Sequence, residues 1–179
     1  MKYPVKVFID SNLHSFKNSN AWHNFLTDYT LLKAAGGIVW NEKKEVLMIK
    51  RFGKWEFPKG KVEEGETIRT AAVREVREES GLQQVKPVLE IASTYHTYII
   101  DNQKVLKRTY WFLMRAENRQ PLKAQEEEGI TKAAWIPCKQ VEELLRDSYQ
   151  SLYELWQQVA QMLEKQPSVR KKVCSFQRK

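Results

Sequence analysis

The stretch from Gly60 to Leu82 reads GKVEEGETIRTAAVREVREESGL, and it decides more of the fold than any other part of the chain. Its apolar residues recur at helical spacing, which predicts an amphipathic helix over about Thr67–Ser80. Thr67 suits the N-cap, and Gly81 suits the left-handed position that ends a helix. The residues that form the predicted buried stripe are Ile68, Ala71, Ala72 and Val76.

The same helix gathers three carboxylates, because residues three and four apart are neighbours on a helical surface. Glu75 therefore faces both Glu78 and Glu79. Carboxylates this close repel one another unless a positive charge lies between them. A hard divalent cation such as Mg²⁺ suits this arrangement, since it takes carboxylate oxygens and phosphate oxygens together. The alternative is a solvated charged face, which Arg74 and Arg77 would help to neutralise.

A longer pattern favours the metal site over the solvated face. The stretch matches Gly-x5-Glu-x7-Arg-Glu-U-x-Glu-Glu-x-Gly-U, where U is a bulky aliphatic residue, and the chain thereby resembles the Nudix hydrolase family. Members cleave a nucleoside diphosphate linked to another moiety, or related pyrophosphates. The resemblance implies an α/β/α sandwich with a mixed β-sheet, and the strand and helix pattern agrees with it. The matching positions are Gly60, Glu66, Arg74, Glu75, Val76, Glu78, Glu79, Gly81 and Leu82.

The resemblance also implies roles for individual residues. Arg74 supports catalysis by orienting a box carboxylate through a charge-assisted bond, and Glu66 is structural. The residues expected to act in catalysis are Glu75, Glu78, Glu79 and Arg74. The expected metal site comprises Glu75, Glu78, Glu79, Gly60 and Glu127.

The last of these metal ligands comes from a distant loop. A loop glutamate often joins the metal site in the family, and here Glu126, Glu127 and Glu128 are available in QEEEGITKAAW. We name Glu127 as the candidate, although the spacing does not distinguish the three, and a solvated acidic loop is the alternative. Whether the general base is a box glutamate or one of this loop stays open.

Basic and aromatic residues outside the carboxylate face are candidates for substrate binding. A lysine or arginine near the metal can hold a phosphate; Lys59 and Lys61 flank Gly60, and Arg51 lies at the end of the preceding predicted strand. Tyr98 lies 16 positions beyond the box, as in diadenosine polyphosphate hydrolases, and could stack on a base; cross-strand packing is the alternative. Arg108, with its neighbour Lys107, completes the expected phosphate-binding set.

Composition places the chain among single-domain globular proteins. It has 179 residues, of which 42% are hydrophobic and 29% charged, and no apolar run is long enough to span a bilayer. The N-terminal sequence lacks the apolar core of a signal peptide, and two cysteines make no disulfide framework. The sequence therefore predicts a cytoplasmic protein with no membrane partner.

The net charge of +8 is mostly a property of the C-terminus. Six basic residues and no acidic one lie between Lys165 and Lys179, which leaves 24 basic and 22 acidic residues elsewhere. A nucleic-acid partner is therefore not expected. The expected partner is an anionic small molecule, a nucleoside or inositol polyphosphate.

We predict three segments along the chain. Residues 1–32 form an N-terminal extension that packs on the domain or on a partner, residues 33–165 form the Nudix domain, and residues 166–179 form a flexible basic tail. Strands are expected over Val85–Tyr98, Lys104–Ala116 and Ala133–Ile136. A helical segment follows over Lys139–Lys165, with Ser148 as the candidate break between two helices. Whether the chain forms a homodimer is left open.

The leading functional hypothesis is a metal-dependent hydrolase of a phosphoanhydride bond, with Mg²⁺ as cofactor and Mn²⁺ as a substitute. Dinucleoside polyphosphates and inositol pyrophosphates are the favoured substrates, while ADP-ribose and oxidised nucleoside triphosphates stay open. Two alternatives come from other classes. One is a Nudix-fold module that senses a nucleotide without cleaving it; the other is an RNA-directed protein, through decapping or binding by the basic tail.

Overall fold

The computed structural model describes residues 4–9, 12–117 and 119–174. Its strands are β1 (Val5–Ile9), β2 (Asn12–Phe16), β3 (Thr30–Trp40), β4 (Glu45–Arg51), β5 (Lys54–Glu56), β6 (Lys59–Lys61), β7 (Lys86–Ile100), β8 (Gln103–Arg115) and β9 (Ile130–Pro137). Its helices are α1 (Ser19–Leu26), α2 (Ile68–Ser80), the 3₁₀ turn η1 (Glu126–Glu128), α3 (Cys138–Arg146), α4 (Gln150–Lys165) and α5 (Pro167–Cys174).

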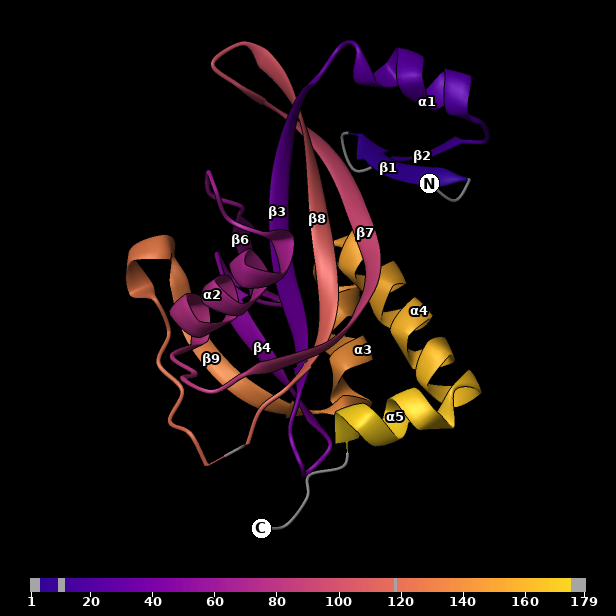
Figure 1. Cartoon of the computed structure of the whole chain (residues 1–179). Coiled ribbons are helices and arrows are strands. Elements are labelled where there is room, and N and C mark those ends of the chain that lie inside the picture. The colour runs from indigo at the N-terminus through magenta and orange to yellow at the C-terminus, as the bar shows by residue number, and fades with distance from the viewer. Residues whose placement is uncertain (1–3, 10–11, 118, 175–179) are drawn as a thin grey trace.

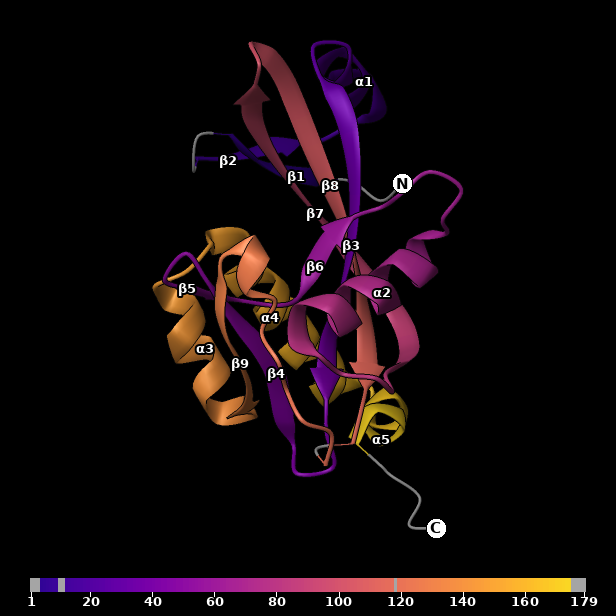
Figure 2. The same ribbon diagram turned by 90° about the vertical axis from the view of Figure 1, so that its left-hand side faces the viewer.

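One mixed sheet lies at the centre of the molecule. Its strand order is β2-β1-β7-β8-β3-β4-β5, with β6 paired to β3 and β9 paired to β4. Strands β3 and β8 run parallel over their whole register, whereas β7 and β8 form a long antiparallel hairpin. Helix α2 covers one face, and α3 and α4 cover the other (Figures 1 and 2). The predicted α/β/α sandwich with a mixed sheet is confirmed.

Alternation along the central strands divides the core between the two faces. In β8, Phe112 and Met114 pack in the cluster beneath α2, while Trp111 and Leu113 pack in the cluster beneath α4. Successive side chains of a strand point to opposite faces, so one strand contributes to both clusters. Gly37 of β3 faces α2, where an added Cβ would meet Val76 and Met114.

Helix α2 has the capping that its sequence predicted. The Thr67 hydroxyl accepts a hydrogen bond from the Thr70 N–H at 3.1 Å, and Gly81 adopts φ of 78°. The Gly81 N–H closes the last turn on the Arg77 carbonyl at 2.8 Å. The helix thus begins and ends where cap residues satisfy its unpaired backbone groups.

The C-terminal half follows the predicted pattern, with one difference. The helical segment divides at Ser148 into α3 and α4, as expected. Residues 166–179 were expected to form a flexible tail, but Pro167–Cys174 form α5, and Val173 is fully buried in the cluster beneath α4. Two apolar residues among the basic ones, Val169 and Val173, explain the docking, since they lie one helical turn apart. Residues 175–179 lie outside the described residues.

The N-terminal segment extends the sheet and carries its own small core. Strand β1 pairs with β2 and lies parallel to β7, with Phe8 opposite His96. Helix α1 packs against these strands through Trp22, whose ring lies edge-on to Tyr95 at 5.2 Å between centroids. The polar run around β2 showed no apolar period in the sequence, so this strand was not predicted.

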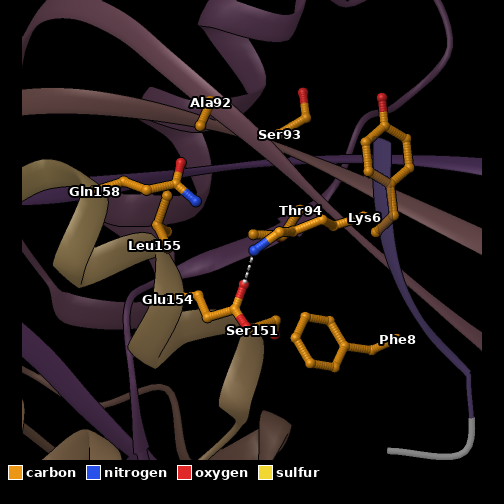
Figure 3. A pocket seen from close by; sticks show the side chains of 10 residues that line it. Lys6, Phe8, Ala92, Ser93, Thr94, Ser151, Glu154, Leu155 and Gln158 are labelled. Carbon is orange, nitrogen blue, oxygen red and sulfur yellow. Dashed lines mark hydrogen bonds and ion pairs between the residues drawn. The ribbon is translucent and has the colours of Figure 1, made fainter. Parts of the chain in front are cut away.

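A small cavity of about 40 Å³ lies where β1 meets α4 (Figure 3). The Lys6 ammonium group reaches across it to the Glu154 carboxylate at 3.2 Å. Lys6 and Phe8 point to the α4 side of the sheet, whereas Val5 and Val7 are buried on the α1 side. The N-terminal segment is therefore held by pairing, by packing and by one ion pair to the opposite end of the chain.

We expect Trp22→Ala to destabilise the protein by about 3–5 kcal/mol, because the ring is 4% exposed and its loss leaves a cavity among aromatic neighbours. Urea unfolding followed by circular dichroism measures the change. Leu13→Ala is the control, since Leu13 is 44% exposed and should cost less than ~0.5 kcal/mol. Equal midpoints for the two variants would contradict an integral role for the N-terminal segment.

Candidate active site

The carboxylate face of α2 meets the backbone of β6 at close range. The Lys59 N–H donates a hydrogen bond to Glu79 Oε2 at 2.7 Å. A Cβ on Gly60 would overlap the Glu75 carboxylate, and a Cβ on Gly36 of the paired strand would overlap the Pro58 carbonyl. Glycine is required at both positions because the chain approaches too closely for any side chain. These contacts place the backbone of β6 at Lys59 and Gly60 beside the carboxylates of Glu79 and Glu75.

Arg74 is the cation at the centre of the carboxylate face. It donates to both carboxylate oxygens of Glu66, at 3.1 and 2.9 Å, and through Nη1 to Glu75 at 2.8 Å and Glu78 at 2.9 Å. A fifth bond runs from Nη2 to the Lys61 carbonyl at 2.9 Å. The bond from Arg74 lowers the pKa of Glu66, so Glu66 is an ionised anchor for the arginine.

Glu79 is the most deeply buried carboxylate of the site, with a side chain that is 0% exposed. Besides the Lys59 N–H, it faces Arg51 Nη1 at 3.2 Å. Burial raises the pKa of Glu79 to about 7 despite these positive partners. The pKa of Glu75 is also raised by burial, which outweighs the opposing bond from Arg74. Both groups therefore gain from a divalent cation that would favour their charged forms.

Arg51 joins the helix to the loop of η1. Besides Glu79, it contacts Glu128 Oε2 at 3.3 Å, and the exposed Phe52 ring next to it packs on Gly129. The Phe52 N–H also donates to the Gly129 carbonyl at 3.3 Å. The loop glutamate that the structure brings to the site is therefore Glu128, whereas Glu127, the candidate named from the sequence, is not among the residues described around the cavity.

A cavity of about 540 Å³ lies beside these groups; Glu75 and Glu78 line it, whereas the fully buried Glu79 does not. Apart from Gly60, every described residue that lines it is charged, so its chemistry suits a highly anionic group with bound cations. The lining residues are Arg51, Lys59, Gly60, Lys61, Glu63, Glu64, Arg74, Glu75, Glu78, Lys107 and Glu128. Three predicted phosphate-binding residues, Arg51, Lys59 and Lys61, are thus brought together with Glu75 and Glu78.

The other predicted substrate residues, Tyr98 and Arg108, lie on opposite faces of the β7–β8 hairpin. Lys107 lies opposite His96, and Tyr98 follows two residues along β7, so these three side chains share one face. Arg108 points to the other face, where its guanidinium lies 4.1 Å from the Tyr110 ring centroid. Neither Arg108 nor Tyr98 lines the cavity, as far as the structure describes it, and Lys107 does. Strand alternation indicates that Lys107 and Arg108 point to opposite faces, but it does not show which face borders the cavity.

The donor set fits a divalent metal. Hard cations take carboxylate and carbonyl oxygens. Glu75, Glu78, Glu128 and the Gly60 backbone line the cavity and could supply such oxygens, and Glu79 is buried beside Lys59. Among residues 4–9, 12–117 and 119–174, no three acidic, histidine or cysteine groups already form a closed metal-ligand cluster. Arg74 bridges Glu75 and Glu78, and Arg51 bridges Glu79 and Glu128, so cationic side chains now balance the carboxylates.

Comparison with known proteins agrees with this geometry. A family model described as the NUDIX domain matches residues 30–157. An RNA pyrophosphohydrolase of Haemophilus ducreyi is 32% identical over 137 residues, covering 65% of this chain and 70% of the relative. That of Proteus mirabilis is 29% identical over 164 residues, covering 80% and 93%.

Solved structures share the fold at low sequence identity. A C. elegans Ap4A hydrolase in a binary complex has a TM-score of 0.57 at 20% identity, with 75% of this chain and 98% of that chain covered. The E. coli dihydroneopterin triphosphate pyrophosphohydrolase has a TM-score of 0.56 at 18% identity, with 70% and 92% covered.

The chain belongs to the Nudix family, as its box predicted. With the complete box assembled beside a polar cavity, it is an enzyme that acts on pyrophosphate bonds. In the described parts of the chain, no helix has both the length and the apolar character needed to span a membrane.

The raised pKa of Glu79 gives a test of the site without substrate. Its value is about 7 in the folded protein against 4.5 ordinarily, so the native state keeps a proton that the unfolded chain loses. Between about pH 4.5 and 7, the stability of the metal-free protein should therefore fall as pH rises, by up to ~3 kcal/mol from this group.

Glu79→Gln should lack this decline, because glutamine does not titrate. Urea unfolding with a chelator present, from about pH 5 to 8, compares the two proteins. Glu143→Gln on the exposed surface of α3 is the control and should follow the wild type. Parallel profiles for wild type and Glu79→Gln would refute the assignment of the raised pKa to Glu79.

Proposed function

We propose that this chain is a Mg²⁺-dependent pyrophosphohydrolase that cleaves a phosphoanhydride bond in a nucleoside polyphosphate or a similarly anionic compound, with Mn²⁺ as a substitute metal. The observation that carries the proposal is one charged cavity whose lining combines Glu75 and Glu78 of α2 with Arg51, Lys59, Lys61 and Lys107. The carboxylates would hold the metal, and the metal and the basic side chains would then bind the phosphates of one substrate.

The chain's own residues prepare the substrate for attack. Glu75, Glu78 and Glu79, with the Gly60 carbonyl and Glu128, would hold divalent metal, which supplies charge neutralisation and a lowered pKa of bound water. Arg74 keeps Glu75 and Glu78 oriented while remaining anchored on Glu66. Lys59 and Lys61, both on β6, bind phosphate oxygens of the substrate. A carboxylate on the face of α2 accepts the proton of the attacking water.

Arg51 has a second role in this proposal. Because it contacts Glu79 and Glu128 together, it positions the loop of η1 against α2 and keeps a positive charge at the cavity. Because two carboxylates already occupy N–H donors of the Arg51 guanidinium, fewer donors are left for substrate than the sequence suggested. We assign it a positioning role with a phosphate contact as an addition.

The candidate substrates differ in the group that is attached to the phosphates. Apart from Gly60 the lining of the cavity is charged, so base recognition would take place outside it. Tyr98 shares a face of the β7–β8 hairpin with Lys107 and suits stacking on a base. Dinucleoside polyphosphates suit this arrangement. RNA 5′ ends are the second candidate, because the similar curated proteins are RNA pyrophosphohydrolases, although the sequence alone predicted no nucleic-acid partner.

Purified protein with Mg²⁺ or Mn²⁺, tested against a panel of phosphoanhydrides, would examine the proposal directly. The panel comprises a dinucleoside tetraphosphate, RNA with a 5′ triphosphate, ADP-ribose, an inositol pyrophosphate and an oxidised nucleoside triphosphate. Release of phosphate or pyrophosphate is measured. Binding without turnover of any compound would instead support a sensing module.

Glu79→Gln should lower metal-dependent turnover on the order of 100-fold or more, since it removes one negative charge from the metal site while keeping the side-chain shape. The control is Glu143→Gln, which lies on α3 outside the cavity and should retain wild-type turnover. Near-normal turnover by Glu79→Gln would remove Glu79 from the mechanism.

A further inference from the structure

Lys107 is a cation of the cavity wall that no carboxylate of the described residues contacts directly. Its side chain is half-buried, and in the described part of the chain this side chain makes no hydrogen bond and no ion pair. The other cations of the cavity differ, because Arg74 and Arg51 each contact two or more carboxylates, and Lys59 contacts Glu56 at 2.9 Å. Lys61 lies exposed at the mouth.

The surroundings of Lys107 make this charge unfavourable. Burial lowers the pKa of Lys107 to about 8, and Lys59 and Arg51 add to the shift, while Glu56 and Glu79 oppose it without forming an ion pair. Its cross-strand neighbour His96 has a pKa lowered to about 4 by burial and by Lys107 and Lys59, so it is neutral near pH 7 and adds no second positive charge. A lysine held in such a position gains most from an anion that enters the cavity.

The backbone of Lys107 lies apart from the backbone that borders the carboxylate face. Strand β3 lies between β8 and β6, so two strand spacings, together about 10 Å, separate Lys107 from the backbone beside Glu75. The cavity nevertheless extends to both. A single phosphate on the metal side would therefore leave the Lys107 end of the cavity without an anion.

We propose that Lys107 forms a second anion subsite, which binds a phosphoryl group other than the one under attack and makes the enzyme prefer chains of three or more phosphates over diphosphates. This inference rests on the proposed function. Its substrate class is a linear polyphosphate: the carboxylate face takes the scissile anhydride, and the lysine takes the group one or two phosphates further along.

Steady-state kinetics of Lys107→Met tests the subsite. The KM for a dinucleoside tetraphosphate should rise about 10-fold or more, the expected loss for one charge-assisted contact to phosphate, whereas the KM for the diphosphate ADP-ribose should change less than about twofold. Lys107→Arg should recover most of the affinity, because it retains the charge. An equal change for both substrates, or no change for either, would overturn the subsite.

Lys104→Met is the matched control. Lys104 lies three residues away on β8, is exposed, and by strand alternation points to the other face. It should leave both KM values unchanged, and equal thermal midpoints for all variants would establish that they fold. A rise in KM for Lys104→Met equal to that for Lys107→Met would show a general effect of charge and overturn the subsite.

Calorimetry with inorganic tripolyphosphate and inorganic pyrophosphate separates this proposal from the proposed function. Wild type should bind tripolyphosphate more tightly, and Lys107→Met should remove that preference even if no compound is turned over. Lack of turnover by the wild type would reject the proposed function alone. Equal tripolyphosphate affinity in wild type and Lys107→Met would reject the subsite alone.

Discussion

The repulsion among the carboxylates of α2 is the constraint on which the rest of the site depends. Three glutamates on one helical face, two of them buried, cannot all be charged without nearby cations. Arg74 meets this need from within the helix, and it is itself oriented by two parallel bonds to Glu66. The spacing between Glu66 and Arg74 in the box therefore has a structural reason. It lets Arg74 link the loop that precedes α2 to the carboxylate face of the helix.

The backbone of β6 completes what the helix begins. It approaches the carboxylates so closely that glycine is required at Gly60, and it donates the Lys59 N–H to the fully buried Glu79. The short strand is held in turn by β3, where Gly36 makes room for Pro58. The site is thus built on packed secondary structure, with loop η1 attached through Arg51. Such support holds functional groups in place more firmly than loops alone would.

Much of this arrangement could be predicted from the chain. The limits and caps of α2, the long hairpin and the division of the C-terminal helices follow from local patterns of apolar residues, cap residues and turns. Strand β2 and the docking of α5 did not follow. Strand β2 is a polar edge strand, so its sequence has no apolar period. In α5, two valines within a basic segment do not predict docking unless the apolar surface that receives them is known.

The sequence by itself determined the class of chemistry, because the spacing of the box brings Glu75, Glu78 and Glu79 onto one face of a helix, and helical geometry needs no distant partner. Tertiary structure alone decided which residues stand opposite that face. Glu128 and Lys107 enter the cavity, and Arg108 does not, because loop placement and the direction of each strand side chain depend on pairing between segments far apart in the chain. Contacts within a helix are local, whereas the composition of a cavity depends on the register of the sheet.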